Sequence, residues 1–444
     1  MISQVSRLTA LGSLLRHPHA VREDIVAFQN ERVGRLIAHA YHRVPYYRAL
    51  FQRSGIKSDD IRTVADLRNV PTTDKRDLQP LPVDEVVARG VDLARLVAHR
   101  TSGSSGEPFT IRRTWIEEHL LGAFRLRALH QFGLRPRDKR VIVVRVRPAD
   151  PADHQLPQRI FQAMGLYRQM AVDCLLEPEE IVSALRRFRP DVLTGFPGVL
   201  SQIAPSVGDD DRRLIHPRFI AVGGEVLTPL MRRQISDAFR APVFETYGSH
   251  EFNLLAWQCK DTGEFHVCDD SIVLEVLKDG RPAAVGERGE VVATSLHSFA
   301  MPFIRYRLGD LVTKGAETCP CGQPFSVIRA IQGRMIDYFP LSDGRALHPY
   351  EIVSIVLRDA PWIRQYRLLQ ERDDRIVLQV VPVTTPSAAD LALLQDRVAK
   401  LVGREVAFVV ALLPQIALEP GGKFRVSRSL VNSRYDGIDW DQRR

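Results

Sequence analysis

The chain of 444 residues is poor in the features that mark secreted and membrane proteins. It has only five cysteines, an odd number, and its N-terminus is a poor match to a signal peptide, so we do not expect a disulfide scaffold. The longest apolar stretch, 406–418, is interrupted by Pro414 and is too short to span a bilayer. We therefore expect a cytoplasmic protein with no membrane partner.

Aromatic residues and lysines are scarce as well. Aromatic residues make up 7% of the chain, and only eight of its 61 basic residues are lysines. The net charge of +8 is spread along the chain and often lies beside acidic residues, whereas nucleic-acid-binding proteins usually gather their basic residues into a stripe. We therefore expect no nucleic-acid partner. A nucleic-acid-binding protein is an alternative that rests on the net charge alone.

What is present is a globular composition, with 45% hydrophobic and 26% charged residues, in a chain long enough for two or three domains. Apolar residues at helical spacing over 31–54 predict helices, interrupted at Val44-Pro45. From about residue 138, short apolar runs alternate with helical patterns, which predicts βαβ units and a doubly wound α/β sheet. The apolar runs lie at 141–144, 191–193, 219–222 and 243–244, and the helical patterns lie at 179–188 and 228–240.

The last part of the chain predicts a change of architecture. Segments 272–277 and 290–294 have strand patterns, which indicates a small β-barrel or a sheet. After Gly333 the pattern indicates a compact α+β unit. Its expected elements are a helix from about residue 348, strands at 365–370 and 375–381, a helix at 387–401 and a strand at 405–412. We therefore expect a large N-terminal domain over 1–333, β-rich at about 255–330, and a small domain over 334–444.

Five short motifs follow one another along the chain. The first is a loop with four hydroxyl side chains and two glycines, whose O–H and N–H groups suit an oxyanion. It consists of Thr101, Ser102, Gly103, Ser104, Ser105 and Gly106. The later motifs are Tyr247-Gly248-x-x-Glu251, Tyr306-Arg-x-Gly-Asp310, Gly-Arg334 and Gly-Lys423. Each motif alone has an ordinary explanation, such as a flexible turn or an exposed lysine.

In this order the motifs resemble those of the adenylate-forming acyl-CoA synthetase superfamily and, more narrowly, of the phenylacetate–CoA ligase family. Further matches lie at 44–47, 71–75, 195–197 and 319–322, so the resemblance extends over essentially the whole chain. It implies an AMP-forming acid–thiol ligase. ATP would activate a carboxylic acid, expected to be aryl or arylacetic, to an acyl-adenylate, and the acyl group would then pass to coenzyme A.

The resemblance also implies a role for each motif. The loop at 101–106 would hold the β- and γ-phosphates of ATP, and Glu251 would bind Mg²⁺. The adenine and acyl pocket would be lined by Gly223, Gly224, Glu225, Thr246, Tyr247 and Gly248. Asp310 would accept hydrogen bonds from the ribose hydroxyls, with Arg334 assisting. Lys423 would bridge the substrate carboxylate and the α-phosphate. The small domain that carries Lys423 would swing about a hinge at 333–337 between the two half-reactions.

Two positions depart from the family pattern. Glu107 stands where many relatives have lysine, and Ile336 replaces the usual polar hinge residue. These changes leave open a non-enzymatic binding protein on a decayed ligase scaffold, although the retained catalytic set counts against it. Acceptors other than coenzyme A are also open, namely a carrier-protein thiol, an amine or a sugar. The oligomeric state is also left open, and a homodimer is one possibility.

The cysteines suggest a separate metal site. One pair has the spacing C-x6-H and the other the spacing C-x-C, and a Cys₃His set suits tetrahedral zinc. The four candidate ligands are Cys259, His266, Cys319 and Cys321. Four protein ligands would leave no open position, so the zinc would be structural. Cys268 competes with His266 for the fourth place, and unliganded cysteines are the alternative. Cys174 is expected to be a small buried apolar residue.

Overall fold

The computed structural model describes residues 16–100, 109–146, 162–334, 339–343, 346–347, 349, 352, 356, 360, 362–418 and 424–431. They form two compact units. The first unit combines the chain up to Leu134 with Phe244–Ile331, and the second combines Arg135–Val243 with the chain from Gln332 on. The predicted domain boundary at 333/334 stays a prediction. None of the helices in the described parts is both long and apolar enough to cross a bilayer.

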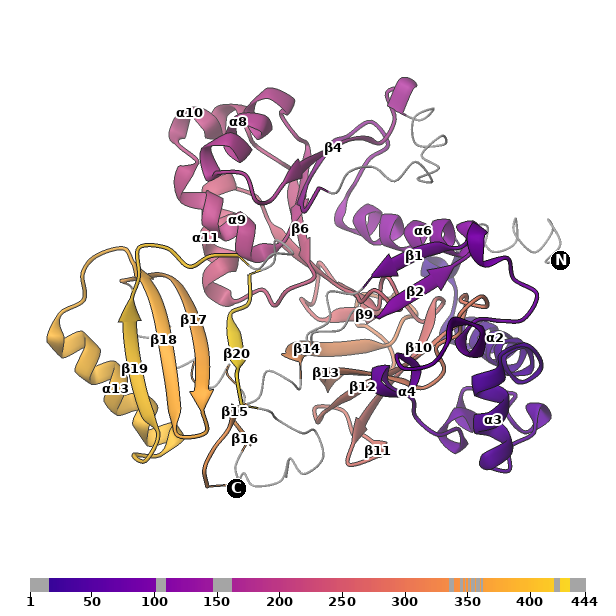
Figure 1. The fold of residues 1–444 in the computed structure, drawn as a ribbon. Coiled ribbons are helices and arrows are strands. Elements are labelled where there is room, and N and C mark those ends of the chain that lie inside the picture. The colour runs from indigo at the N-terminus through magenta and orange to yellow at the C-terminus, as the bar shows by residue number, and fades with distance from the viewer. Residues whose placement is uncertain are drawn as a thin grey trace. The chain divides into compact units, whose positions relative to one another are not determined.

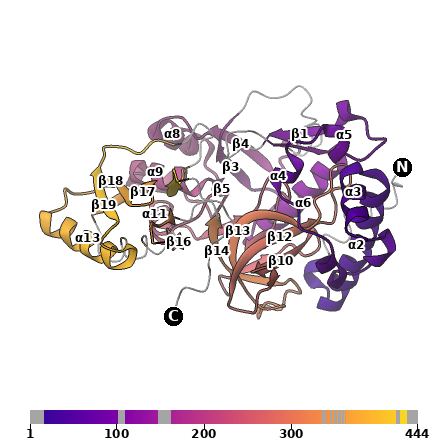
Figure 2. The same ribbon diagram turned by 60° about the horizontal axis from the view of Figure 1, so that its bottom comes forward.

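The first unit begins with helices and short turns. Its helical elements are η1 (His17–His19), α2 (Arg22–Arg43), α3 (Pro45–Arg53), η2 (Ser58–Asp60), η3 (Ala65–Asn69), α4 (Lys75–Leu78), α5 (Val83–Val86), η4 (Leu93–Arg95) and α6 (Trp115–Phe132). The predicted break at Val44-Pro45 is confirmed, because proline has no N–H to continue α2 and instead starts α3. Helices α2 and α3 pack against each other (Figure 2).

The strands of the first unit form a hairpin and a large sheet. The hairpin pairs β1 (Val97–Arg100) with β2 (Thr110–Arg113) in antiparallel fashion. The sheet strands are β7 (Val243–Tyr247), β8 (Ala256–Gln258), β9 (Phe265–Val267), β10 (Ile272–Lys278), β11 (Arg281–Pro282), β12 (Arg288–Ser295), β13 (Tyr306–Lys314) and β14 (Val327–Arg334). Their order is β11-β10-β12-β13-β14-β9-β8-β7, so the predicted β-rich part is a sheet that continues into β7.

The second unit contains the parallel sheet expected from the apolar runs. Its strand order is β6-β5-β3-β4, so β3 has β5 and β6 on one side and β4 on the other, as in a doubly wound sheet. The elements are β3 (Lys139–Val144), β4 (Arg168–Asp173), α8 (Pro178–Phe188), β5 (Val192–Gly195), α9 (Pro197–Ile203), η5 (Ala204–Ser206), α10 (Asp209–Leu214), β6 (Phe219–Gly223) and α11 (Pro229–Phe239). Val141, Leu193 and Ile220 lie opposite one another on neighbouring strands, and their side chains are fully buried. On β6, four successive residues are buried, so both faces of that strand are covered and its sequence is an unbroken apolar run.

The C-terminal part of the second unit is the α+β structure that the sequence predicts. Its sheet has the order β19-β18-β17-β20, and a further pair joins β15 (Phe339–Pro340) to β16 (Ala346–Leu347). The sheet strands are β17 (Ile363–Arg372), β18 (Arg375–Pro382), β19 (Ala407–Leu412) and β20 (Ser427–Ser429). Helix α13 (Ala388–Val402) packs on β19 (Figure 1). The helix expected from about residue 348 falls largely outside the described residues.

Candidate active site

In the first unit, the Tyr-Gly-x-x-Glu motif lies where β7 ends. Tyr247 is the last residue of β7, and its hydroxyl donates a 2.6 Å hydrogen bond to Oδ2 of Asp310. Both side chains are buried, with 7% and 8% of their surface exposed. The contact joins two motifs that are 63 residues apart in the sequence. The structure thus brings together two residues that the resemblance places around one nucleotide.

The loop after Tyr247 requires glycine at its first position. A Cβ added to Gly248 would lie 2.1 Å from the carbonyl oxygen of Asn253, closer than any real carbon–oxygen contact. The loop is closed by hydrogen bonds from Asn253 N to Ser249 O at 2.8 Å and from Leu255 N to Tyr247 O at 2.8 Å. The glycine therefore lets the chain fold tightly back, with Glu251 inside the turn.

Asp310 lies inside a strand, whereas a Gly-Asp pair after a strand is usually part of a turn. The pairing of β12 with β13 shifts register, because Glu290 opposes Leu311 while Val292 opposes Arg307. Gly309 has a φ of +71°, which L side chains rarely adopt. The irregularity places extra residues on β13, and it brings Asp310 to face Tyr247.

Glu251 contacts the same strand. Its Oε1 accepts a 3.4 Å hydrogen bond from the hydroxyl of Tyr306, the first residue of β13. Burial, followed by the negative charge of Glu251, raises the pKa of Tyr306 well above its usual value. The tyrosine therefore stays neutral and remains a donor to the carboxylate.

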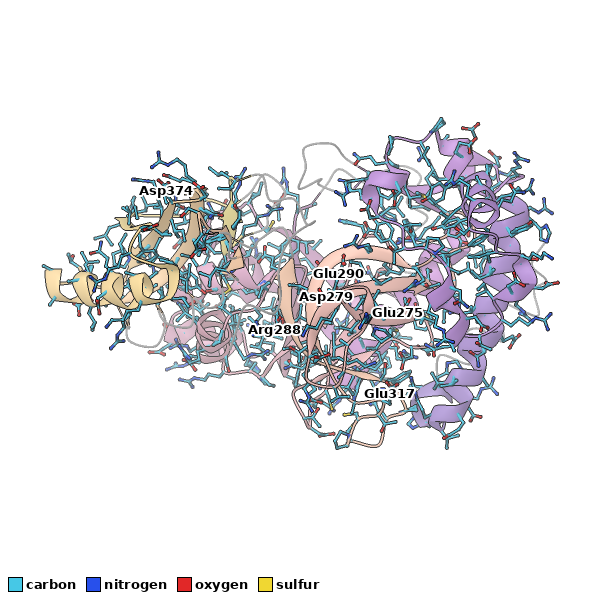
Figure 3. All side chains as sticks on the ribbon, turned by 90° about the horizontal axis from the view of Figure 1, so that it is seen from below. Glu275, Asp279, Arg288, Glu290, Glu317 and Asp374 are labelled. Carbon is cyan, nitrogen blue, oxygen red and sulfur yellow. The ribbon has the colours of Figure 1, made fainter. Side chains whose placement is uncertain are left out.

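The start of β13 is fixed by the motif at 71–75. Thr73 N donates to Arg305 O at 3.0 Å, and Arg307 N donates to Thr73 O at 2.8 Å. The guanidinium of Arg305 binds both carboxylate oxygens of Glu275 on β10, at 3.0 and 2.9 Å. Glu290 on β12 accepts from Arg307 in the same way, with Oε1 bound by Nε at 3.1 Å and Oε2 by Nη2 at 2.8 Å. Figure 3 labels both acidic residues on their strands.

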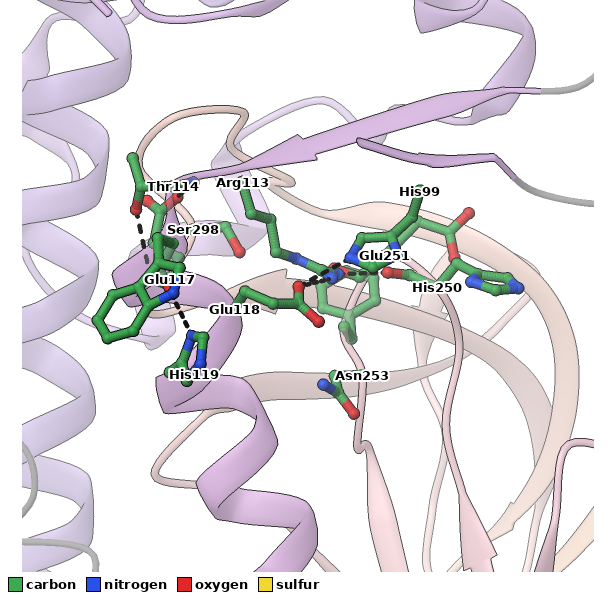
Figure 4. A network of polar contacts seen from close by, with 12 residues as sticks. His99, Arg113, Thr114, Glu117, Glu118, His119, His250, Glu251, Asn253 and Ser298 are labelled. Carbon is green, nitrogen blue, oxygen red and sulfur yellow. Dashed lines mark hydrogen bonds and ion pairs between the residues drawn. The ribbon is translucent and has the colours of Figure 1, made fainter. Parts of the chain in front are cut away.

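Sequence reasoning missed a polar network on the other side of the Glu251 loop. Arg113 at the end of β2 donates to the main-chain oxygens of His250 and Glu251, and it also pairs with Glu118 of α6 (Figure 4). The side chain of His250, by contrast, is exposed. No spacing or motif marks Arg113, so only the tertiary structure identifies it.

In the second unit, the Gly-Gly-Glu segment follows β6 and binds main-chain groups. Glu225 Oε2 accepts a 2.9 Å hydrogen bond from Gly198 N in the first turn of α9, and Oε1 accepts one from Phe424 N. Phe424 is 1% exposed. A Cβ added to Gly198 would lie 2.2 Å from Cβ of Phe424, so the glycine permits this close approach.

Several predicted site residues fall outside the described parts. They are the loop at 101–106, with Glu107, the hinge residues 335–337, and Lys423, although Phe424 follows that lysine directly in the chain. Arg334 is the last residue of β14. Gly223 ends β6, and Thr246 lies within β7.

The four candidate zinc ligands gather at one place in the first unit. One ligand atom from each of Cys259, His266, Cys319 and Cys321 lies within 4.8 Å of the others. The sulfurs of Cys259 and Cys319 are 3.9 Å apart, and Sγ of Cys321 is 3.3 Å from Nε2 of His266. Zinc–sulfur bonds of about 2.3 Å in a tetrahedron place sulfurs roughly 3.8 Å apart, so the observed spacing fits a zinc ion. It is far too long for a disulfide.

The chemistry of the cluster also fits a metal. Burial lowers the pKa of His266 to about 4, so the imidazole is neutral, as a ligand must be. Cys268, the competing candidate, is not part of the cluster. Its sulfur instead accepts a 3.4 Å hydrogen bond from Arg127. Cys174 is 2% exposed in the core of the second unit, as predicted.

Comparisons with known proteins identify relatives that match most of the chain. No protein-family model matches it. A phenylacetate–coenzyme A ligase of Thermus thermophilus is 26% identical over 371 residues, which cover 79% of each chain. A phenylacetate–coenzyme A ligase of Pseudomonas putida is 26% identical over 437 residues, covering 92% of this chain and 93% of the relative.

A solved structure shows the same fold. The structure of a 2-hydroxyisobutyryl-CoA ligase in its postadenylation state superposes with a TM-score of 0.77 at 20% identity, covering 93% of this chain and 90% of that one. The chain is therefore similar over most of its length to phenylacetate–coenzyme A ligases, and it has the fold of the adenylate-forming CoA ligases.

Proposed function

We propose that the protein is an ATP-dependent, AMP-forming acid–CoA ligase. In the first step, a carboxylate oxygen of the acid bonds to the α-phosphorus of ATP, the bond to the β-phosphate bridge breaks, and pyrophosphate leaves. In the second step, the thiolate of coenzyme A bonds to the acyl carbon and AMP leaves. The first step is needed because a carboxylate is a poor electrophile, and adenylation gives it a good leaving group.

One observation carries the proposal beyond the sequence similarity. The Tyr-Gly-x-x-Glu loop and the Tyr-Arg-x-Gly-Asp strand meet through two hydrogen bonds, Tyr247 to Asp310 and Tyr306 to Glu251. These contacts set two carboxylates beside one loop in the first unit. One carboxylate suits ribose hydroxyls and the other suits a hard cation.

Each motif residue has a separate role in the proposed reaction. Asp310 accepts hydrogen bonds from the ribose, and Tyr247 orients it by donating to Oδ2. Lys423 stabilises the charge that grows between the carboxylate and the α-phosphate. Arg334 assists at the nucleotide. The Thr/Ser/Gly loop at 101–106 holds the β- and γ-phosphates with its N–H and O–H groups. The part from residue 334 on is a mobile small domain that delivers Lys423 and withdraws it.

Two metals belong to the proposal. Mg²⁺ would be held by Glu251, whose carboxylate is partly exposed, and it would neutralise phosphate charge. Zn²⁺ would be held by Cys259, His266, Cys319 and Cys321. Because all four ligands come from the protein, zinc would join the turn after β8, the strand β9 and the 319–321 segment without contributing to the reaction.

The test is ATP–pyrophosphate exchange with the purified protein, without coenzyme A, over a panel of aryl, arylacetic and aliphatic acids. We expect exchange with an aryl or arylacetic acid and its loss in Lys423→Ala. Formation of the CoA thioester from the same acid then separates coenzyme A from a carrier-protein, amine or sugar acceptor. Absence of both exchange and ATP binding would contradict the proposal and favour a decayed binding scaffold.

A further inference from the structure

A buried arginine donates hydrogen bonds to the main chain of the loop that carries Glu251. The side chain of Arg113, the last residue of β2, is 3% exposed. Its Nη2 donates to the carbonyl oxygen of His250 and, at 3.0 Å, to that of Glu251. Figure 4 shows the guanidinium reaching this loop from the end of the strand. One guanidinium nitrogen thus binds two successive peptide groups at the position expected to bind Mg²⁺.

The charge of this arginine is balanced by Glu118 of α6. Arg113 Nη1 donates to Glu118 Oε2 at 3.0 Å, and the same oxygen contacts Nε2 of His99 at 3.0 Å. Burial raises the pKa of Glu118, but the hydrogen bond and charge of His99 and the charge of Arg113 outweigh it and lower the pKa to about 2. Glu118 is therefore ionised at any working pH, and it holds the guanidinium plane in a fixed direction.

The network joins the β1–β2 hairpin to the loop that carries Glu251. His99 lies in β1 and Arg113 ends β2, and the two strands pair with His99 opposite Ile111. In the sequence, these strands flank the segment 101–108, which contains the expected phosphate-binding loop. The network thus ties the strands on either side of that segment to the Glu251 loop.

We propose that Arg113 is a positioning residue for Mg²⁺ binding by Glu251, an inference that rests on the proposed ligase function. Arg113 fixes the peptide groups on both sides of the Glu251 Cα, which limits the directions that its carboxylate can take. Glu118 and His99 hold Arg113 in place. A lysine would not substitute, because a single ammonium cannot present the planar fork that reaches the loop and Glu118 together.

The first test measures both half-reactions in Arg113→Lys and Arg113→Gln. We expect the Mg²⁺ concentration for half-maximal pyrophosphate exchange to rise roughly tenfold or more, since charged hydrogen bonds to the loop are lost. Transfer from a synthetic acyl-adenylate to coenzyme A needs no Mg·ATP and should keep its rate. Arg112→Gln is the matched control, because alternation along β2 points this neighbour to the other face. An unchanged Mg²⁺ dependence, or an equal loss in both half-reactions, would overturn the proposal.

A second test does not depend on activity. Amide hydrogen exchange of residues 248–255 reports on the loop hydrogen bonds, such as that from Asn253 N to Ser249 O. We expect faster exchange there in Arg113→Gln but not in Arg112→Gln. If the natural protein shows no pyrophosphate exchange with any acid, the ligase function fails, while amide exchange still decides whether Arg113 orders the loop. Unchanged amide exchange in Arg113→Gln would refute the positioning role by itself.

Discussion

The contact between Gly198 and Phe424 leads to a prediction about the first half-reaction. In Gly198→Ala, the new Cβ would lie 2.2 Å from Cβ of Phe424 and 2.9 Å from Oε2 of Glu225. The phenylalanine is 1% exposed, and the Glu225 carboxylate already accepts the N–H groups of Gly198 and Phe424. Neither neighbour has room to yield, so we expect the segment with Phe424 to leave α9.

The size of the effect follows from the contacts that would be lost. A hydrogen bond from an N–H group to a carboxylate contributes about 1.5–3 kcal/mol. Burial of a phenylalanine side chain contributes about 1.5–3 kcal/mol. Losing both would cost roughly 3–6 kcal/mol, and each 1.4 kcal/mol is about a tenfold change. The equilibrium between docked and undocked segment should therefore shift at least about a hundredfold toward the undocked form.

Because Lys423 precedes Phe424 in the chain, undocking should remove the lysine from the adenylation step. We expect pyrophosphate exchange by Gly198→Ala to fall, by up to about two orders of magnitude for a hundredfold shift of the docking equilibrium. Transfer from synthetic acyl-adenylate to coenzyme A should persist. The control is Gly122→Ala in α6, where an added Cβ meets no atom within 4 Å. If Gly198→Ala keeps normal exchange, or if a folded variant loses both half-reactions equally, the docking argument is wrong.

Three further predictions concern single side chains. Tyr247→Phe removes a donor to the buried Asp310, and we expect the KM for ATP in pyrophosphate exchange to rise roughly tenfold. Cys319→Ser should lower the zinc content, measured by mass spectrometry, from about one ion per chain to a small fraction of that value. Burial, followed by the charge of Arg32, lowers the pKa of His297 to about 3, so the unfolded chain takes up this proton first. Stability should therefore fall by up to about 1.4 kcal/mol per pH unit as the pH drops from about 6.5 toward 3, and His297→Gln should flatten this slope in urea unfolding.

Matched controls sharpen these tests. Cys174→Ser changes a buried cysteine of the second unit and should leave the zinc content unchanged. His119→Gln changes an exposed histidine and should leave the pH dependence of stability unchanged. A zinc content in Cys319→Ser equal to that of the natural protein would contradict the proposed site.

The prediction for His297 also has a structural reason. Nδ1 of His297 accepts a hydrogen bond from Arg32 at 2.6 Å, while Nε2 faces the carbonyl oxygen of Asp270 at 2.8 Å. Protonation of Nδ1 would break the hydrogen bond from Arg32.

The sequence predicted most of the secondary structure because the signals are local. The run that became β6 is apolar because both faces of that strand are buried, whereas β3 alternates buried Val141 and Val143 with half-buried Ile142 and Val144. Pro45 separates α2 from α3 through its own missing N–H. The cysteine spacing predicted the zinc ligands but left His266 and Cys268 as competitors, because they lie only two residues apart. Only the structure shows that the Cys268 sulfur faces Arg127.

For the candidate active site, too, some features could be predicted from the sequence and others only from the structure. By itself the sequence determined which chemical groups are present and in which order, since motif order and residue type need no folding to be read. Only the tertiary structure decided which groups meet: Tyr247 with Asp310 across 63 residues, and Arg113 with the loop of Glu251 across 138 residues. Such pairings depend on strand register, a bulge and the path of a hairpin. The periodicity of apolar residues indicates which residues are buried, but it does not indicate which residues of other strands and helices they contact.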